Sequence, residues 1–76
     1  MKNSRLVKAR KKKGFTQAEL AQILGYKGKQ TIANWENGHS KPPLNKAIEM
    51  AIILESDVAI LFGSDVQETY TKSFSA

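Results

Sequence analysis

The sequence predicts an all-α fold built from five short helices. Two observations support this prediction. No stretch alternates apolar and polar residues over more than a few positions, as a strand with one buried face would. Apolar residues instead recur at helical spacing, and glycines interrupt them at intervals that suit short helices, at Gly14, Gly25, Gly38 and Gly63. With 76 residues, the chain has room for a single small core.

The first two helices are predicted from their apolar faces and from their ends. Residues 3–13 place Leu6 and Arg10 on one face of the first helix. Thr16 and Glu19 have the spacing of a capping box, in which each side chain bonds the other residue's backbone N–H at a helix start. The second helix then runs to Gly25, and its apolar side is expected to hold Leu20, Ala21, Ile23 and Leu24.

Three more helices are predicted after this one. The third is expected from about residue 28 to residue 37, with Gly28 at its cap. Residues 39–43 form a loop, because the paired prolines in it cannot continue a helix. The fourth helix is expected over about residues 44–54 and the fifth over about 57–62. The inward stripe of the fourth is predicted to be Leu44, Ala47, Ile48, Ala51 and Leu54.

The chain is expected to divide into a helical domain at residues 1–63 and a polar tail at residues 64–76. The tail is rich in serine and threonine, which favours a flexible segment. Val66, Tyr70 and Phe74 recur every four residues, however, and would form one stripe if the tail were helical. An ordered interaction element is therefore the alternative.

Positive charge is concentrated in the first part of the chain. Residues 1–46 hold eleven basic and two acidic side chains, a net charge of +9, whereas residues 47–76 hold one basic and five acidic side chains, a net charge of −4. Such a division favours a polyanionic partner for the basic part, such as a nucleic acid.

Enzymes, metalloproteins and membrane proteins are not expected. The chain has no cysteine and a single histidine, His39, and it has no paired carboxylates, nucleophile motif or phosphate-binding glycine loop. We therefore expect no metal, no cofactor and no small-molecule substrate. The longest wholly apolar run, residues 51–54, is far shorter than a membrane span, and no secretory signal is recognisable. A cytoplasmic protein is expected.

The second and third predicted helices have the spacing of a helix-turn-helix. They are separated by the four residues 25–28, and two short helices joined by such a glycine-containing turn define this motif. On a helical wheel of the third helix, Ile32 points inward while Gln30 and Asn34 point outward. Amide side chains match adenine N6 and N7 in the DNA major groove, and the neighbouring Lys29 matches guanine.

Together these residues resemble the phage repressor and Cro-type helix-turn-helix family, also called XRE-like. The resemblance covers about residues 4–62 and rests on Arg10, residues 16–22, Leu24, Gly25, Ile32, residues 35–38, Pro42, Leu44, Ala51, Leu54, Val58 and Leu61. It implies a compact, lambda-repressor-like domain whose third helix enters the major groove of a double-stranded operator. It also implies a transcriptional regulator of the Cro or repressor type, working as a dimer.

The resemblance implies a role for individual residues. The base-facing positions are Lys29, Gln30 and Asn34. The DNA phosphate positions are Gln17, Thr31, Asn37 and Lys41. Arg10 and Glu36 match a structural ion pair between the first and third helices. The turn is one residue longer than the family's usual pattern, so the base-facing assignments could shift by one position.

The acidic part of the chain supports a second hypothesis. Ile52, Ile60 and Phe62 are expected to form an apolar surface patch large enough to need a protein partner. A second copy of the chain would make a homodimer, whereas a different regulatory protein would make this chain an anti-repressor, a modulator or an antitoxin on the same fold. A salt-dependent DNA titration distinguishes these functions from direct operator binding.

Overall fold

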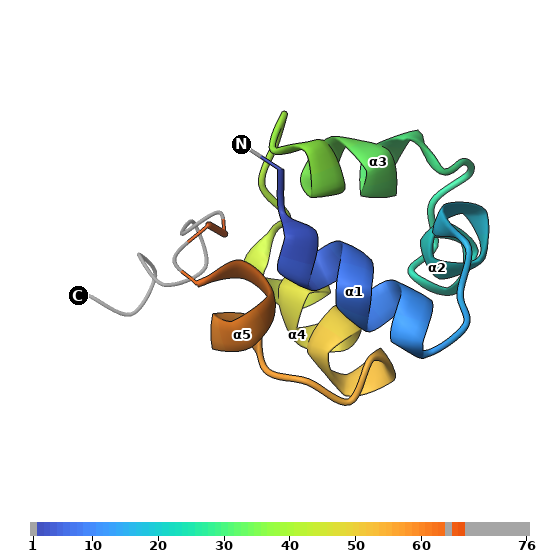
Figure 1. The fold of residues 1–76 in the computed structure, drawn as a ribbon. Helices are drawn as coiled ribbons and strands as arrows, with labels where there is room; N and C mark the ends of the chain where they lie inside the picture. The colour runs from blue at the N-terminus through green and yellow to red at the C-terminus, as the bar shows by residue number, and fades with distance from the viewer. Residues whose placement is uncertain (1, 64, 67–76) are drawn as a thin grey trace.

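The computed structural model describes residues 2–63 together with Asp65 and Val66. Its five helices are α1 (Ser4–Lys12), α2 (Gln17–Ile23), α3 (Gln30–Asn37), α4 (Leu44–Ile53) and α5 (Val58–Phe62). In Figure 1, α1 runs across the middle of the molecule, with α3 above it, α2 at one end and α4 and α5 below. The all-α prediction is confirmed, and each predicted helix matches an observed one to within two residues at either end.

Side chains at the helix starts explain where α1 and α2 begin. The Asn3 side-chain oxygen accepts a hydrogen bond from the Leu6 backbone N–H at 3.0 Å and caps α1. At α2 both bonds of the predicted capping box are present, from the Glu19 backbone N–H to the Thr16 hydroxyl at 3.1 Å and from the Thr16 N–H to the Glu19 carboxylate at 2.8 Å. These caps pair helix amides that have no acceptor inside their own helix.

The start of α3 differs from the prediction. The helix begins at Gln30, and Lys29 rather than Gly28 occupies the cap position, where it makes no side-chain cap hydrogen bond. The far end of α3 is as expected, because Gly38 takes the left-handed conformation, with φ of 78°, that ends a helix. The connection between α2 and α3 therefore spans the six residues 24–29.

The core lies where the five helices meet. α1 packs on α3 and α5, α2 packs on α3, and α4 packs on α5. Each helix contributes apolar side chains to one buried cluster, which holds Leu6, Leu20, Ala21, Leu24, Ile32, Trp35, Ala47, Met50, Ala51, Leu54, Leu61 and Phe62. Among the described residues, no helix has the length and apolar character needed to cross a membrane.

Three burial predictions are wrong. Ile23 and Ile48 were expected in the core, but their exposed fractions are 51% and 43%. The buried side of α4 is centred on Ala47, Met50 and Ala51, which leaves Ile48 about 100° away at the edge. Phe62 was expected at a protein interface, but it is only 6% exposed. Residues 58, 61 and 62 share one side of a helix, and in α5 that side faces the core.

Only the beginning of the predicted tail is described. The Asp65 backbone N–H donates a hydrogen bond to the Phe62 carbonyl at 2.9 Å, and Val66 packs against the core. Residues 64 and 67–76 lie outside the described residues, and with them the stripe expected from Tyr70 and Phe74.

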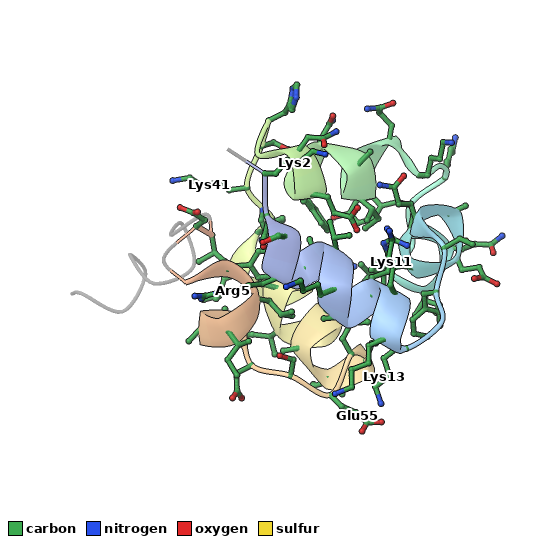
Figure 2. All side chains as sticks on the ribbon, in the orientation of Figure 1. Lys2, Arg5, Lys11, Lys13, Lys41 and Glu55 are labelled. Carbon is green, nitrogen blue, oxygen red and sulfur yellow. The ribbon has the colours of Figure 1, made fainter. Side chains whose placement is uncertain are left out.

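An ion pair connects the ends of α1 and α4 on the side of the molecule away from α3 (Figure 2). Lys13 Nζ lies 2.8 Å from Glu55 Oε2, and the Glu55 side chain is 75% exposed. As a hydrogen-bond donor and a positive charge, the Lys13 ammonium lowers the pKa of the Glu55 carboxyl.

Candidate nucleic-acid interface

The long connection between α2 and α3 is held against the core. The Tyr26 ring meets the Trp35 ring edge-on, with 5.6 Å between centroids and 83° between planes. Lys46 of α4 donates a hydrogen bond from Nζ to the Leu24 carbonyl at 2.8 Å, and the same ammonium lies 5.7 Å from the centre of the Tyr26 ring. The extra residue of the turn is thus accommodated while α3 stays packed on α2.

α3 has one buried side and one outward side. Ile32, Trp35 and Glu36 are buried at 0%, 5% and 4% exposure. On the other side, Gln30 is exposed and Asn34 is half-buried. Gln30 Nε2 donates a hydrogen bond to Asn34 Oδ1 at 3.0 Å, so the two amides lie together on the surface of the helix.

This hydrogen bond determines what the two amides can offer a ligand. It uses one of the two Gln30 N–H donors and one lone pair of the Asn34 oxygen, and it leaves the Gln30 carbonyl free to accept and the Asn34 NH₂ free to donate. One acceptor beside one donor is what the major-groove edge of adenine requires, because N6 donates and N7 accepts. The pair can therefore contact adenine as a unit.

A buried ion pair joins α1 to α3. Arg10 Nε lies 2.6 Å from Glu36 Oε2, Arg10 Nη2 lies 3.3 Å from Glu36 Oε1, and both side chains are less than one-tenth exposed. Arg10 Nη1 also donates a hydrogen bond to the Phe15 carbonyl at 2.8 Å, just before α2. The guanidinium thus connects α1, α3 and the segment that leads into α2, and it fixes how α3 sits on the rest of the domain.

Gln17, an expected phosphate contact, belongs to the same network. Its Nε2 donates a hydrogen bond to Glu36 Oε1 at 2.8 Å, and the residue is half-buried. Its backbone N–H is at the first position of α2, where helix amides have no acceptor within the helix. A side-chain hydrogen bond therefore connects the start of α2 to the Glu36 carboxylate of α3.

Lys11 lies close to two of the expected DNA-contacting residues, Gln17 and Lys29, although sequence reasoning did not single it out. It lines a shallow hollow beside the start of α2, together with Thr16, Gln17 and Lys29. Lys29 and Lys11 thus place two positive charges beside one hollow, near the N-terminal end of α3. Within the run of residues 11–13, no local pattern separates Lys11 from its neighbours, and only the packing of α1 shows which lysine faces α2.

The remaining expected phosphate contacts lie along α3 and in the loop after it. Thr31 is half-buried, whereas Asn37 and Lys41 are exposed. In the described part of the chain, no group of three His, Cys, Asp or Glu side chains could hold a metal ion.

Comparison with known proteins identifies the motif. The helix-turn-helix family model matches residues 6–61, which include most of α1, α2 to α4 complete and most of α5. Searches among curated proteins and among solved structures found no match. The matched region contains the capping box, the buried ion pair and the outward face of α3 described above.

Proposed function

Because this chain belongs to the XRE-type helix-turn-helix family, a family of DNA-binding regulators, we propose that it is a sequence-specific transcriptional regulator of the Cro or repressor type. The Gln30–Asn34 pair on the outward face of α3 is the main support, since it offers one acceptor beside one donor. We place the protein in the cytoplasm, on an operator in double-stranded DNA.

Charge around α3 supports the same proposal. Lys29 lies at the start of the helix, Lys41 follows its end, and Lys11 reaches the same side from α1. Lysine ammonium groups bind DNA phosphates and displace counterions from them. Sequence-specific DNA binding needs both kinds of residue. Cations that contact phosphates set the position of the protein on the duplex, and amides that contact bases supply the specificity.

Selection of binding sites from a random duplex library tests this function. We expect the wild-type protein to enrich one short motif, which supplies a defined duplex for further work. On that duplex, log K should fall linearly with log salt, with a slope of about −0.9 per phosphate contacted and roughly three to five contacts per subunit. Absence of any enriched motif, together with no binding at about 50 mM salt, would contradict the proposal.

We further propose that α4 and α5 pair with a second copy of the chain. Ile48 and Ile52 are four residues apart on one face of α4, and their exposed fractions are 43% and 72%. Ile60 of the neighbouring α5 is 53% exposed. Three exposed isoleucines on two helices that pack on each other favour a partner. A two-fold pair would set two α3 helices against successive major-groove segments.

Charged substitutions test this pairing. Ile52→Asp combined with Ile60→Asp should convert a dimer into a monomer in sedimentation velocity and weaken binding to the selected duplex. Ile23→Asp is the matched control, because Ile23 is 51% exposed but lies on α2, and it should keep the wild-type association state. A wild-type protein that sediments as a monomer would contradict the homodimer and favour the anti-repressor, modulator or antitoxin alternative.

A further inference from the structure

The N-terminal segment, residues 2 and 3, lies outside the region matched by the family model and is tied to the end of α3. The Asn3 backbone N–H donates a hydrogen bond to the Glu36 carbonyl at 2.7 Å. The Asn3 side chain donates from Nδ2 to the Leu61 carbonyl of α5 at 2.7 Å, while its oxygen caps α1. One residue is thus bonded to three helices, and the backbone next to it has little freedom.

The hydrogen bond to Glu36 holds residues 2 and 3 at the C-terminal end of α3. The last four carbonyls of a helix have no partner within the helix. In α3, the Asn34 and Trp35 carbonyls accept hydrogen bonds from the residues that follow the helix, and the Glu36 carbonyl accepts the one from Asn3. Residue 2 is therefore positioned beside the C-terminal end of α3, where the helix dipole favours a positive charge.

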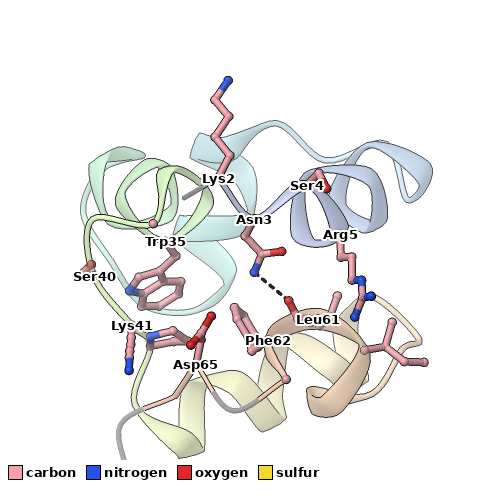
Figure 3. A pocket seen from close by; sticks show the side chains of 14 residues that line it. Lys2, Asn3, Ser4, Arg5, Trp35, Ser40, Lys41, Leu61, Phe62 and Asp65 are labelled. Carbon is pink, nitrogen blue, oxygen red and sulfur yellow. Dashed lines mark hydrogen bonds between the residues drawn. The ribbon is translucent and has the colours of Figure 1, made fainter.

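Lys2 is exposed and extends along the α3 side of the molecule, whereas Arg5 extends toward α5 (Figure 3). Lys2 lines the rim of a cavity of about 380 Å³ together with Trp35 and with Ser40 and Lys41 from the loop after α3, and its ammonium points outward, away from that cavity (Figure 3). The loop that follows α3 is where we expect the DNA backbone to pass. The N-terminal segment thus brings another cation to that loop from a distant part of the chain.

We propose that Lys2 contacts a DNA phosphate beside those expected at Asn37 and Lys41, so that the N-terminal segment extends the DNA interface at the C-terminal end of α3. The proposal rests on the DNA-binding function proposed above. Because Asn3 is already held by hydrogen bonds to α1, α3 and α5, only the lysine side chain has to be ordered on binding, which keeps the entropic cost of the contact low. An ammonium binds phosphate as a point charge and needs no rigid geometry.

Lys2→Gln tests the contact, with Lys13→Gln as the matched control. Both variants remove one positive charge from an exposed lysine, but Lys13 pairs with Glu55 on the side away from α3. Binding to the selected duplex is measured by fluorescence anisotropy between about 50 and 200 mM salt. We expect Lys2→Gln to flatten the salt slope by about 0.9 per bound subunit, so the affinity ratio across this range shrinks about 3.5-fold. Lys13→Gln should keep the wild-type slope.

Two other outcomes are decisive. If the wild type binds and Lys2→Gln has the same slope as Lys13→Gln, the contact at Lys2 is wrong while the proposed function stands. If the wild type binds no duplex, both proposals fail. Melting curves of the two variants verify that each is folded when its slope is measured.

Discussion

Glu36→Ala is expected to lower the melting temperature by at least about 12 °C. The substitution leaves the Arg10 guanidinium buried without a counter-charge, and removing one partner of a buried ion pair costs about 3–5 kcal/mol. In a domain of this size, each kilocalorie per mole shifts the melting temperature by about 4–8 °C. Gln17 loses its acceptor in the same step, so one hydrogen bond between α2 and α3 is lost as well.

Glu55→Ala is the control for this prediction. Glu55 also pairs with a cation, but its side chain is 75% exposed, and water solvates both charges when such a pair is broken. Its removal should shift the melting temperature by at most a few degrees. Thermal unfolding followed by circular dichroism measures both variants. Equal melting temperatures for the two variants would show that the Arg10–Glu36 pair does not hold α3 in place.

Helix ends could be predicted where the stabilising group is local. Thr16 and Glu19 are three residues apart, so their mutual capping is visible as a motif, and it is present. The start of α3 could not be predicted in this way, because its cap residue, Lys29, contributes no side-chain hydrogen bond. Gly28, with no side chain, resembled a weak cap, and the helix begins beyond it.

Burial was harder to predict than helical structure. In α4 the apolar residues surround most of the helix, so a wheel alone could not show that Met50 faces the core while Ile48 does not. In α5 five residues provide little more than one turn, which is too short to separate the inward Phe62 from the outward Ile60. The packing of α5 against α1 and α4 determines which side chains of α4 and α5 are buried.

In the candidate site, too, contacts within one helix could be predicted and contacts between distant segments could not. Helical spacing was sufficient to group Gln30 with Asn34, because residues four apart lie on one face. The position of Lys11 beside Gln17 and the bond from Asn3 to Glu36 depend on how distant segments pack. Periodicity within one helix contains no information about such contacts.

Gln30→Ala and Asn34→Ala are expected to lose discrimination at one base pair of each half-site. The hydrogen bond between the two amides leaves one acceptor and one donor for adenine, so either substitution breaks the pair. A bidentate base contact contributes about 1–3 kcal/mol, which corresponds to about a 5- to 150-fold loss of preference. Because the two residues act as a unit, the double variant should lose little more than either single variant.

Lys41→Ala is the control for a residue that contacts the DNA backbone and not a base. A lysine that contacts phosphate has no preference among bases, so its removal should weaken binding to all duplexes alike and flatten the salt slope by about one. A change of this kind in Gln30→Ala or Asn34→Ala would mean that these amides contact the backbone of the DNA and that α3 has been placed in the wrong register.

The most direct test is the affinity of the wild type and Asn34→Ala for the selected duplex and for duplexes that differ from it at one base pair. If α3 reads the major groove, Asn34→Ala will bind the variants at one position of each half-site as well as it binds the selected sequence, and it will keep the wild-type ranking elsewhere. An unchanged ranking at every position, or an equal loss on all duplexes, would contradict sequence reading by α3.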